Sequence, residues 1–259
     1  MVNFIRKVSK GSKFNQIYVP KEMESIIDVG DLVQVNLLEK KSNIYYKNQG
    51  KLSKFKEYMI KNIFDNLKKF KEIDLVFLVG SFLDEDIYND IDLIIVFNEY
   101  RRPLEKSIEY NLSKILNQRF HILSFNHEKL KELIEKDPLT RAMFQKYISN
   151  KKINLDYKKK INWRHIKILL MMPEDLLELD LPSKIFFDNI RRLMTIERFL
   201  YNKDLSRKVI LEEMKKNIPL DLFHKIKDND NIDKSELRIL RRIIKEKLIR
   251  IKSLEYGKK

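Results

Sequence analysis

Two apolar segments on either side of a Gly-Ser step constrain the fold of this chain most. Residues 74–79 and 90–97 are rich in Leu, Ile, Val and Phe, and both have the length of a β-strand. A third such segment covers residues 120–125. Helical spacing of apolar residues precedes, separates and follows these segments, over residues 54–70, 104–116, 127–134 and 138–148. This alternation predicts an α/β (α+β) fold, with a sheet covered by helices on at least one face.

The polar residues between the first two segments indicate a site for metal and phosphate. Residues two apart in a strand point to the same face, so Asp90 and Asp92 project together. Neighbouring carboxylates repel each other unless a cation lies between them, and Mg²⁺ or Mn²⁺ suits such oxygen ligands. Gly80 allows a sharp turn of the backbone. The N–H groups of this turn and the Ser81 hydroxyl can donate hydrogen bonds to phosphate oxygens. Metal beside phosphate is the apparatus of phosphoryl or nucleotidyl transfer.

Gly80-Ser81, followed after eight residues by Asp90-Ile91-Asp92, resembles the signature of the DNA polymerase β-type nucleotidyltransferase superfamily. The resemblance covers about residues 55–155. It implies that Asp90 and Asp92 are catalytic and bind Mg²⁺ or Mn²⁺, and that Gly80 and Ser81 bind the nucleotide phosphates. The implied reaction transfers a nucleoside monophosphate from an NTP such as ATP to an acceptor and releases pyrophosphate.

One position departs from the pattern of this family. Active members usually carry a third carboxylate on the next strand, but residues 119–125 contain no acid, and His121 occupies the corresponding position. A neutral imidazole is a poor Mg²⁺ ligand and supplies no charge, so we expect His121 to be structural. We expect the loop acids Asp84, Glu85 and Asp86 to be solvated. The sequence leaves open whether the core is an active enzyme.

The first residues resemble a second family. Residues 4–38 contain an Ile-Tyr-Val-Pro-Lys-Glu segment and a Gly-Asp turn, and are similar to the AbrB-type swapped-hairpin DNA-binding domain. We expect strands at residues 15–19 and 32–38, which need a partner because two strands do not form a stable core alone. The resemblance implies a homodimer that contacts DNA through Arg6, Lys7, Lys10 and Lys13. The alternative is a dimerisation or docking hairpin with an ordinary basic surface.

Beyond residue 160 no strand pattern continues. Apolar spacing predicts helices at residues 183–201, 206–216 and 233–256, and prolines, among them Pro173, mark breaks. Asp233 and Glu236 have the spacing of a capping box at the start of the last of these helices.

The positive charge of the chain is concentrated towards its two ends. The 259 residues carry a formal net charge of +15. Residues 1–56 hold 11 basic and 5 acidic residues, residues 57–150 hold 14 and 16, and residues 151–259 hold 28 and 17. Basic flanks suit a polyanion such as nucleic acid, but charge-rich surfaces are also common in proteins from hot environments, where they solubilise.

The sequence predicts three parts. They are a β hairpin over residues 1–40, a nucleotidyltransferase core over 54–155 and a basic helical domain over 160–259, with a linker at residues 40–53. No apolar stretch has the length of a membrane span or of a signal-peptide core, and the chain has no cysteine. We therefore expect a soluble, cytoplasmic protein.

Two functions of different classes follow from these features. The first is a metal-dependent nucleotidyltransferase that binds an NTP and acts on an acceptor such as nucleic acid. The alternative is a DNA-binding regulator whose nucleotidyltransferase core is catalytically inactive. The missing third carboxylate favours the regulator, whereas the retention of Gly80, Ser81, Asp90 and Asp92 favours the enzyme. An RNA-binding interaction protein is a third hypothesis that rests on charge alone.

Overall fold

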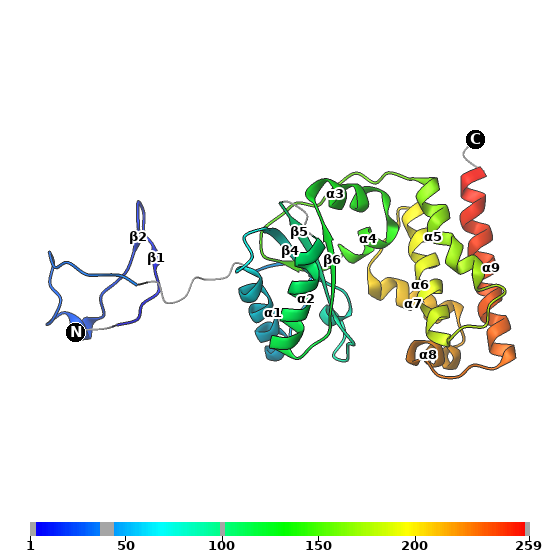
Figure 1. The fold of residues 1–259 in the computed structure, drawn as a ribbon, viewed down its shortest axis with the longest axis horizontal. Helices are drawn as coiled ribbons and strands as arrows, with labels where there is room; N and C mark the ends of the chain where they lie inside the picture. Colours follow the sequence, from blue (N-terminus) through cyan, green and yellow to red (C-terminus); the bar gives the residue numbers. More distant parts are fainter. Residues whose placement is uncertain (1–3, 37–43, 99–101, 257–259) are drawn as a thin grey trace. The chain divides into compact units, whose positions relative to one another are not determined.

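The structure is a computed structural model and describes residues 4–36, 44–98 and 102–256. The chain divides into two compact units, Met1–Lys41 and Ser42–Lys259. The second unit contains a β-sheet with its covering helices, referred to below as the core, and a group of further helices, the helical domain (Figure 1).

A mixed five-stranded sheet forms the centre of the core. Its strand order is β3-β7-β4-β5-β6; the β5–β6 pair is parallel and the other pairs are antiparallel. The strands are β3 (Tyr45–Lys47), β4 (Ile73–Val79), β5 (Ile91–Phe97), β6 (Phe120–Phe125) and β7 (Tyr147–Ser149). The three predicted strands are thus confirmed as β4, β5 and β6, and the α/β (α+β) fold class is confirmed with them.

The two shortest strands of this sheet, β3 and β7, were not predicted. β3 lies in the segment that we expected to be a linker, and β7 overlaps the last two residues of the helix predicted over residues 138–148, so both predictions are wrong at these positions. Three residues are too few to show the alternation of a strand. β7 is buried along its whole length between β3 and β4, so its conformation depends on neighbours that are distant in sequence.

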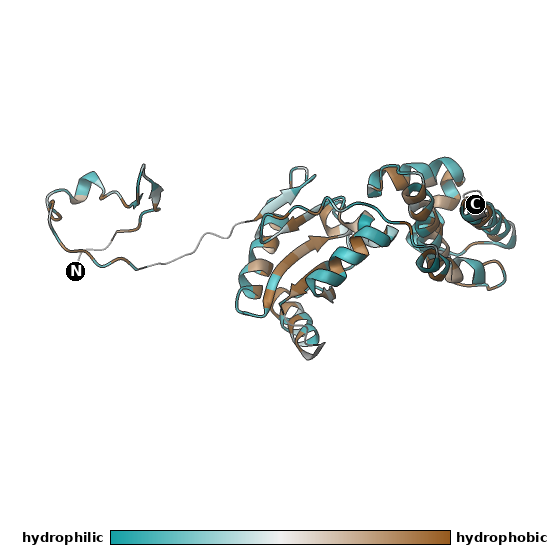
Figure 2. Cartoon of the chain, turned by 90° about the horizontal axis from the view of Figure 1, so that it is seen from above, coloured by the Kyte–Doolittle hydropathy of each residue, from teal (hydrophilic) through white to brown (hydrophobic). Residues whose placement is uncertain are grey.

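Helices cover both faces of the sheet. They are α1 (Lys54–Leu67), α2 (Arg102–Leu116), α3 (His127–Lys136) and α4 (Pro138–Met143). Val76 and Leu78 of β4 belong to the same buried cluster as α1 and α2, whereas Phe77 and Val79 pack with α3 and the end of α4. Because successive side chains of β4 pack against opposite faces of the sheet, the strand is apolar and buried from Leu75 to Val79. The central strands of the sheet are mainly hydrophobic in the hydropathy colours (Figure 2).

The helical domain contains α5 (Trp163–Asp175), α6 (Ser183–Leu200), α7 (Arg207–Asn217), α8 (Leu220–Asp228) and α9 (Lys234–Tyr256). The three predicted helices are confirmed as α6, α7 and α9, whereas α5 and α8 were missed. Pro173 lies inside α5 and not at a break, and Ile168 and Met171 on the exposed side of α5 obscure its apolar stripe. Within the part of the chain described here, no helix combines the length and apolar character needed to cross a membrane.

The predicted capping box at the start of α9 is confirmed. The Glu236 backbone N–H donates to Asp233 Oδ1 at 2.8 Å, and Glu236 Oε2 accepts from the Asp233 backbone N–H at 2.9 Å. Two backbone N–H groups at the beginning of the longest helix are thereby satisfied.

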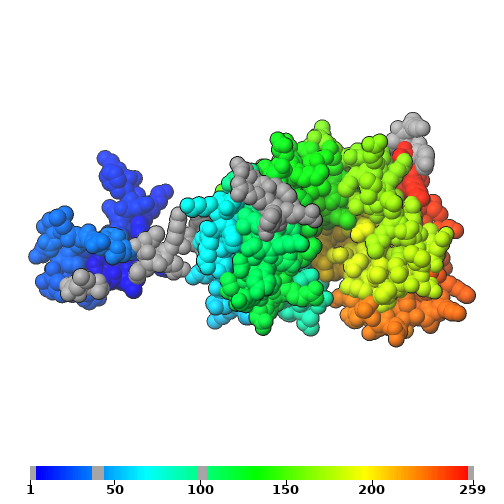
Figure 3. Space-filling model, in the orientation of Figure 1, coloured from blue at the N-terminus to red at the C-terminus, as the bar shows by residue number. Residues whose placement is uncertain are grey.

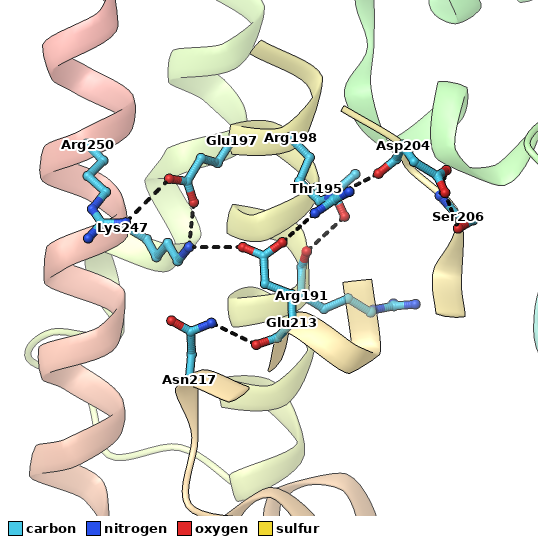
Figure 4. Close-up of polar contacts among 10 residues, drawn as sticks. All are labelled: Arg191, Thr195, Glu197, Arg198, Asp204, Ser206, Glu213, Asn217, Lys247 and Arg250. Carbon is cyan, nitrogen blue, oxygen red and sulfur yellow. Dashed lines mark hydrogen bonds and ion pairs between the residues drawn. The ribbon is translucent and has the colours of Figure 1, made fainter. Parts of the chain in front are cut away.

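A network of ion pairs joins three helices of the helical domain (Figure 4). Lys247 of α9 is 5% exposed and donates to Glu197 of α6 at 2.5 Å and to Glu213 of α7 at 3.5 Å. Glu213 also accepts from Arg198 of α6 at 2.6 Å. Because buried charges require partners, this network fixes α7 against α6 and α9.

The described residues of the first unit form little regular secondary structure. It contains a short hairpin of β1 (Ser9–Lys10) and β2 (Asn15–Gln16) and a 3-10 turn, η1 (Lys21–Met23). The strand predicted at residues 15–19 is thus limited to β2, because β1 offers only two residues for pairing. The strand predicted at residues 32–38 is wrong for 32–36, which form no strand; residues 37 and 38 lie outside the described residues. The AbrB-type resemblance is not supported, and the predicted dimer and DNA contacts remain predictions.

Replacement of Lys247 tests the ion network. Lys247→Met leaves two carboxylates without their shared cation, and we expect the free energy of unfolding to fall by about 3 kcal/mol in urea titrations. The matched control is Lys252→Met, also on α9, which removes a solvent-exposed pair with Glu174. We expect a loss of about 0.5 kcal/mol there. Equal losses of unfolding free energy in Lys247→Met and Lys252→Met would contradict the claim that the buried network stabilises the fold more than an exposed ion pair.

The same network predicts a dependence of stability on pH. Burial opposes ionisation of Glu213, but the hydrogen bond from Arg198 and the charge of Lys247 outweigh it and lower the pKa of Glu213. A lowered carboxyl pKa stabilises the fold above the unfolded pKa of about 4.3, and this contribution is lost as the pH falls through the lower folded value. Unfolding midpoints measured from pH 7 downwards are therefore expected to fall less steeply for Glu213→Gln than for the parent chain.

Candidate active site

The Gly80-Ser81 step forms a tight turn at the end of β4. Gly80 has a φ of +84°, a backbone conformation that residues with a side chain rarely adopt. The chain continues into the 3-10 turn η2 (Ser81–Leu83), in which the Leu83 N–H donates to Gly80 O at 3.2 Å and the Asp84 N–H donates to Ser81 O at 2.9 Å. Ser81 is only partly buried and lies directly after β4, at one edge of the sheet.

Asp92 lies against this turn. It is the second residue of β5 and pairs with Val79, the last residue of β4. A Cβ atom at position 80 would overlap Asp92 Oδ2, so the carboxylate occupies the space that the missing side chain leaves. Asp90 immediately precedes β5 and is close enough for its negative charge to act on Asp92. The structure therefore brings together Gly80, Ser81, Asp90 and Asp92, the four residues that the sequence singled out.

The carboxyl group of Asp92 is held in an unfavourable electrostatic environment. Partial burial raises its pKa, and the negative charge of Asp90 raises it further, while a contact with His121 acts in the opposite direction. His121 is the direct neighbour of Asp92 in the parallel β5–β6 register, and its Nδ1 lies 3.1 Å from Asp92 Oδ1. The imidazole, which is itself exposed, thus takes the place beside Asp92 where the family resemblance led us to look for a third acid.

The donor atoms suit a cation that shares its coordination with a ligand. Among the residues described, no three His, Asp or Glu side chains converge into a complete metal site. Mg²⁺ is commonly held by one or two carboxylates, with phosphate oxygens and water as its remaining ligands. Asp90 and Asp92 beside the Gly80 turn fit this pattern, because the mutual repulsion of their charges would be relieved by a divalent cation.

The helical domain contributes two arginines that the sequence analysis missed. Arg207, the first residue of α7, donates to Glu85 Oε1 from Nη2 at 2.7 Å and from Nε at 3.2 Å. Its positive charge also acts to lower the pKa of Asp92. Burial and the like charge of Arg207 lower the pKa of Arg191 on α6, which also lies within the field of Asp92.

The expectation that all three loop acids are solvated is therefore wrong for two of them. Glu85 binds Arg207, and Asp84 binds Lys146 at 2.5 Å, whereas the Asp86 side chain is fully exposed. The partners Arg207 and Lys146 lie 122 and 62 residues further along the chain, so no local sequence pattern predicts these pairs.

In the space-filling view the core and the helical domain meet along a recessed seam (Figure 3).

The basic residues predicted to contact DNA belong to the other unit. Arg6 and Lys7 precede β1, Lys10 ends it, and Lys13 lies in the turn before β2. All four side chains are exposed. Their contact with DNA stays a prediction.

Comparison with a family model identifies the class of the core. Residues 60–138 match the family described as "Polymerase beta, Nucleotidyltransferase". This segment contains the Gly80 turn, both aspartates and His121. It is a nucleotidyltransferase domain of the polymerase β type, whose general reaction is the transfer of a nucleoside monophosphate.

Two solved structures are similar to this chain. Spectinomycin adenyltransferase AAD(9) from Enterococcus faecialis, determined with ATP and spectinomycin, shares 17% identity over 75% of this chain and 100% of its own, with a TM-score of 0.42. The complex of a tri-AMPylated HEPN toxin with the MNT antitoxin from Shewanella oneidensis gives a match at 15% identity. It covers 35% of this chain and 87% of the other, with a TM-score of 0.24. A search of curated proteins finds no match.

The contact between Gly80 and Asp92 gives a prediction for stability. Gly80→Ala places a side chain in an unfavourable backbone conformation and against the Asp92 carboxylate, so we expect the free energy of unfolding to fall by about 1–3 kcal/mol. Gly50→Ala is the matched control, because a Cβ atom there meets no atom within 4 Å. Urea titration of both variants measures the difference. Equal stability of the Gly80→Ala and Gly50→Ala variants would contradict the close contact between Gly80 and the Asp92 carboxylate.

Proposed function

We propose that the chain is a metal-dependent nucleotidyltransferase that binds an NTP at the Gly80 turn. The observation that supports this most directly is the packing of the Asp92 carboxylate against Gly80, because the proposed metal ligand and the proposed phosphate-binding turn then lie within one site. Metal and phosphate must meet in this way in any metal-assisted transfer of a nucleotidyl group.

Asp90 and Asp92 are the proposed ligands of Mg²⁺ or Mn²⁺. The cation, when bound, neutralises charge on the phosphates and makes the α-phosphorus a better electrophile. The backbone N–H groups after Gly80 and the hydroxyl of Ser81 are the proposed donors to the phosphate oxygens. The acceptor oxygen then forms a bond to the α-phosphorus, the bond to the leaving pyrophosphate breaks, and the hydroxyl proton of the acceptor passes to water.

Arg207 and Arg191 are the proposed cationic partners of the triphosphate. Both guanidinium groups lie within the electrostatic field of Asp92, although they come from helices of the other part of this unit. The guanidinium group of arginine is a planar cation that suits the geometry of phosphate oxygens. Such groups stabilise the negative charge that develops on pyrophosphate as it leaves.

The acceptor is proposed to be a polyanion such as nucleic acid. This rests on the excess of basic residues in residues 151–259 and in residues 1–56. The exposed apolar residues of the first unit, such as Leu32 and Val35, support the proposal that two copies of the chain associate there. A cytoplasmic location agrees with this substrate class and is part of the same proposal.

A second candidate is a DNA-binding regulator with an inactive core. The observation that favours it is His121, which occupies the position beside Asp92 without supplying the negative charge of a third acid. Such a protein would bind nucleotide without turning it over.

Incubation with labelled NTPs separates the two candidates. The parent chain, supplied with Mg²⁺ or Mn²⁺ and with DNA or RNA acceptors, is expected to release pyrophosphate and to label the acceptor. Asp90→Ala and Asp92→Ala are expected to lower the rate by at least about 100-fold, since each removes a proposed metal ligand. Asp86→Ala, a fully exposed acid of the same loop, is the matched control and is expected to retain the parent rate.

The outcomes differ for each candidate. Metal-dependent turnover that survives Asp92→Ala would show that the site is wrongly assigned. DNA binding that weakens with salt concentration, without any release of pyrophosphate, would select the regulator.

A further inference from the structure

A buried lysine lies beneath the loop that connects the Gly80 turn to Asp90. Lys56, in the first turn of α1, is 6% exposed. Its Nζ lies 5.5 Å from the ring centroid of Phe82 and 5.9 Å from that of Tyr88, two aromatic residues of this loop that pack edge to face. Burial of an ammonium group is costly unless the group is hydrogen-bonded. The hydrogen-bond acceptor of Lys56 therefore shows which part of the loop the lysine holds.

That partner is the backbone of Glu85. Lys56 Nζ donates to Glu85 O at 2.7 Å, while a carboxylate oxygen of the fully exposed Asp86 lies 3.8 Å away. The Glu85 backbone N–H in turn donates to Ser81 O at 2.8 Å. The main chain of Glu85 is therefore fixed from two sides, by the buried ammonium group and by the turn that follows Gly80.

The side chain of Glu85 carries this constraint to the helical domain. It accepts two hydrogen bonds from Arg207, and pairing of this kind fixes the plane of the guanidinium group. Two other side chains hold the backbone of this loop at a different residue. Lys146 and Gln49 both donate a hydrogen bond to Leu83 O and not to Glu85. Among the side chains that anchor the loop through these contacts, Lys56 is the one that holds Glu85, the residue which binds Arg207.

We propose that Lys56 is a positioning residue of the nucleotide site. It holds the main chain of Glu85 so that the carboxylate orients Arg207 towards the triphosphate bound at the Gly80 turn. This inference rests on the proposed function, since it assigns Arg207 to the nucleotide. Lys56 itself touches neither the nucleotide nor the metal.

Binding of nucleotide without an acceptor tests this role. Isothermal titration with Mg²⁺ and ATP, GTP, CTP or UTP first establishes which of these the parent chain binds. Lys56→Met keeps the aliphatic stem between the rings but removes the ammonium group, and it is expected to weaken the binding of that NTP about tenfold. Lys56→Arg, which keeps the charge and the donors, is expected to restore most of the affinity.

The matched control is Lys159→Met. Lys159 makes contacts of the same kind, donating to Phe199 O at 2.6 Å with its Nζ 4.9 Å from the centroid of the Phe199 ring, but these contacts lie away from the loop. We expect this variant to lose stability without any change in nucleotide affinity. A loss of stability alone therefore cannot produce the pattern expected for Lys56→Met.

A second measurement does not need nucleotide. Lys56 and Arg207 are connected through Glu85, so the shifts in unfolding midpoint caused by Lys56→Met and Arg207→Gln are expected to be non-additive in the double variant. If the parent chain binds an NTP while Lys56→Met binds it equally well, or if the two shifts simply add, the positioning role is overturned and the proposed function stands. If the parent chain binds none of the four NTPs, the proposed function fails, and the role of Lys56 in nucleotide binding fails with it.

Discussion

The close approach of the Gly80 backbone to the Asp92 carboxylate is the contact on which the site depends. A side chain at position 80 would occupy the space of Asp92 Oδ2, and the positive φ of Gly80 turns the chain away from the sheet at that point. The carboxylate is consequently kept beside Asp90 at a cost, since burial and repulsion raise its pKa. Groups held in this way are ready to bind a cation, because the cation relieves the repulsion that the fold maintains.

The helical domain completes the electrostatics of the site, although it is not part of the segment that matches the nucleotidyltransferase family. Its ion network around Lys247 fixes α7, and the first residue of α7 is Arg207. The ion network inside the helical domain therefore determines where the positive charge of Arg207 lies relative to the core. In the proposed site the core supplies the carboxylates and the turn at Gly80, and the helical domain supplies the cations, so a bound nucleotide would contact both.

Sequence alone predicted those features that local patterns encode. β4 and β5 each contain a run of five apolar residues, and the spacing of Gly80, Asp90 and Asp92 is short enough to read directly from the sequence. The position of His121 beside Asp92 followed from the resemblance to the nucleotidyltransferase family, in which a third acid lies on the next strand. Glu85 and Arg207 could not be paired from the sequence, because the partner of a loop acid depends on how two distant parts of the chain pack against each other. The strand β7 was missed for a similar reason, since its neighbours in the sheet are distant in sequence.

The central claim is that one edge of the sheet binds both a cation and a nucleotide. A crystal structure of the chain with Mn²⁺ and a non-hydrolysable ATP analogue tests it most directly, because Mn²⁺ is identified by its anomalous scattering. The claim predicts an anomalous peak between the carboxylates of Asp90 and Asp92, with the triphosphate against the N–H groups that follow Gly80. A nucleotide bound elsewhere, with no Mn²⁺ at these two aspartates, would contradict it.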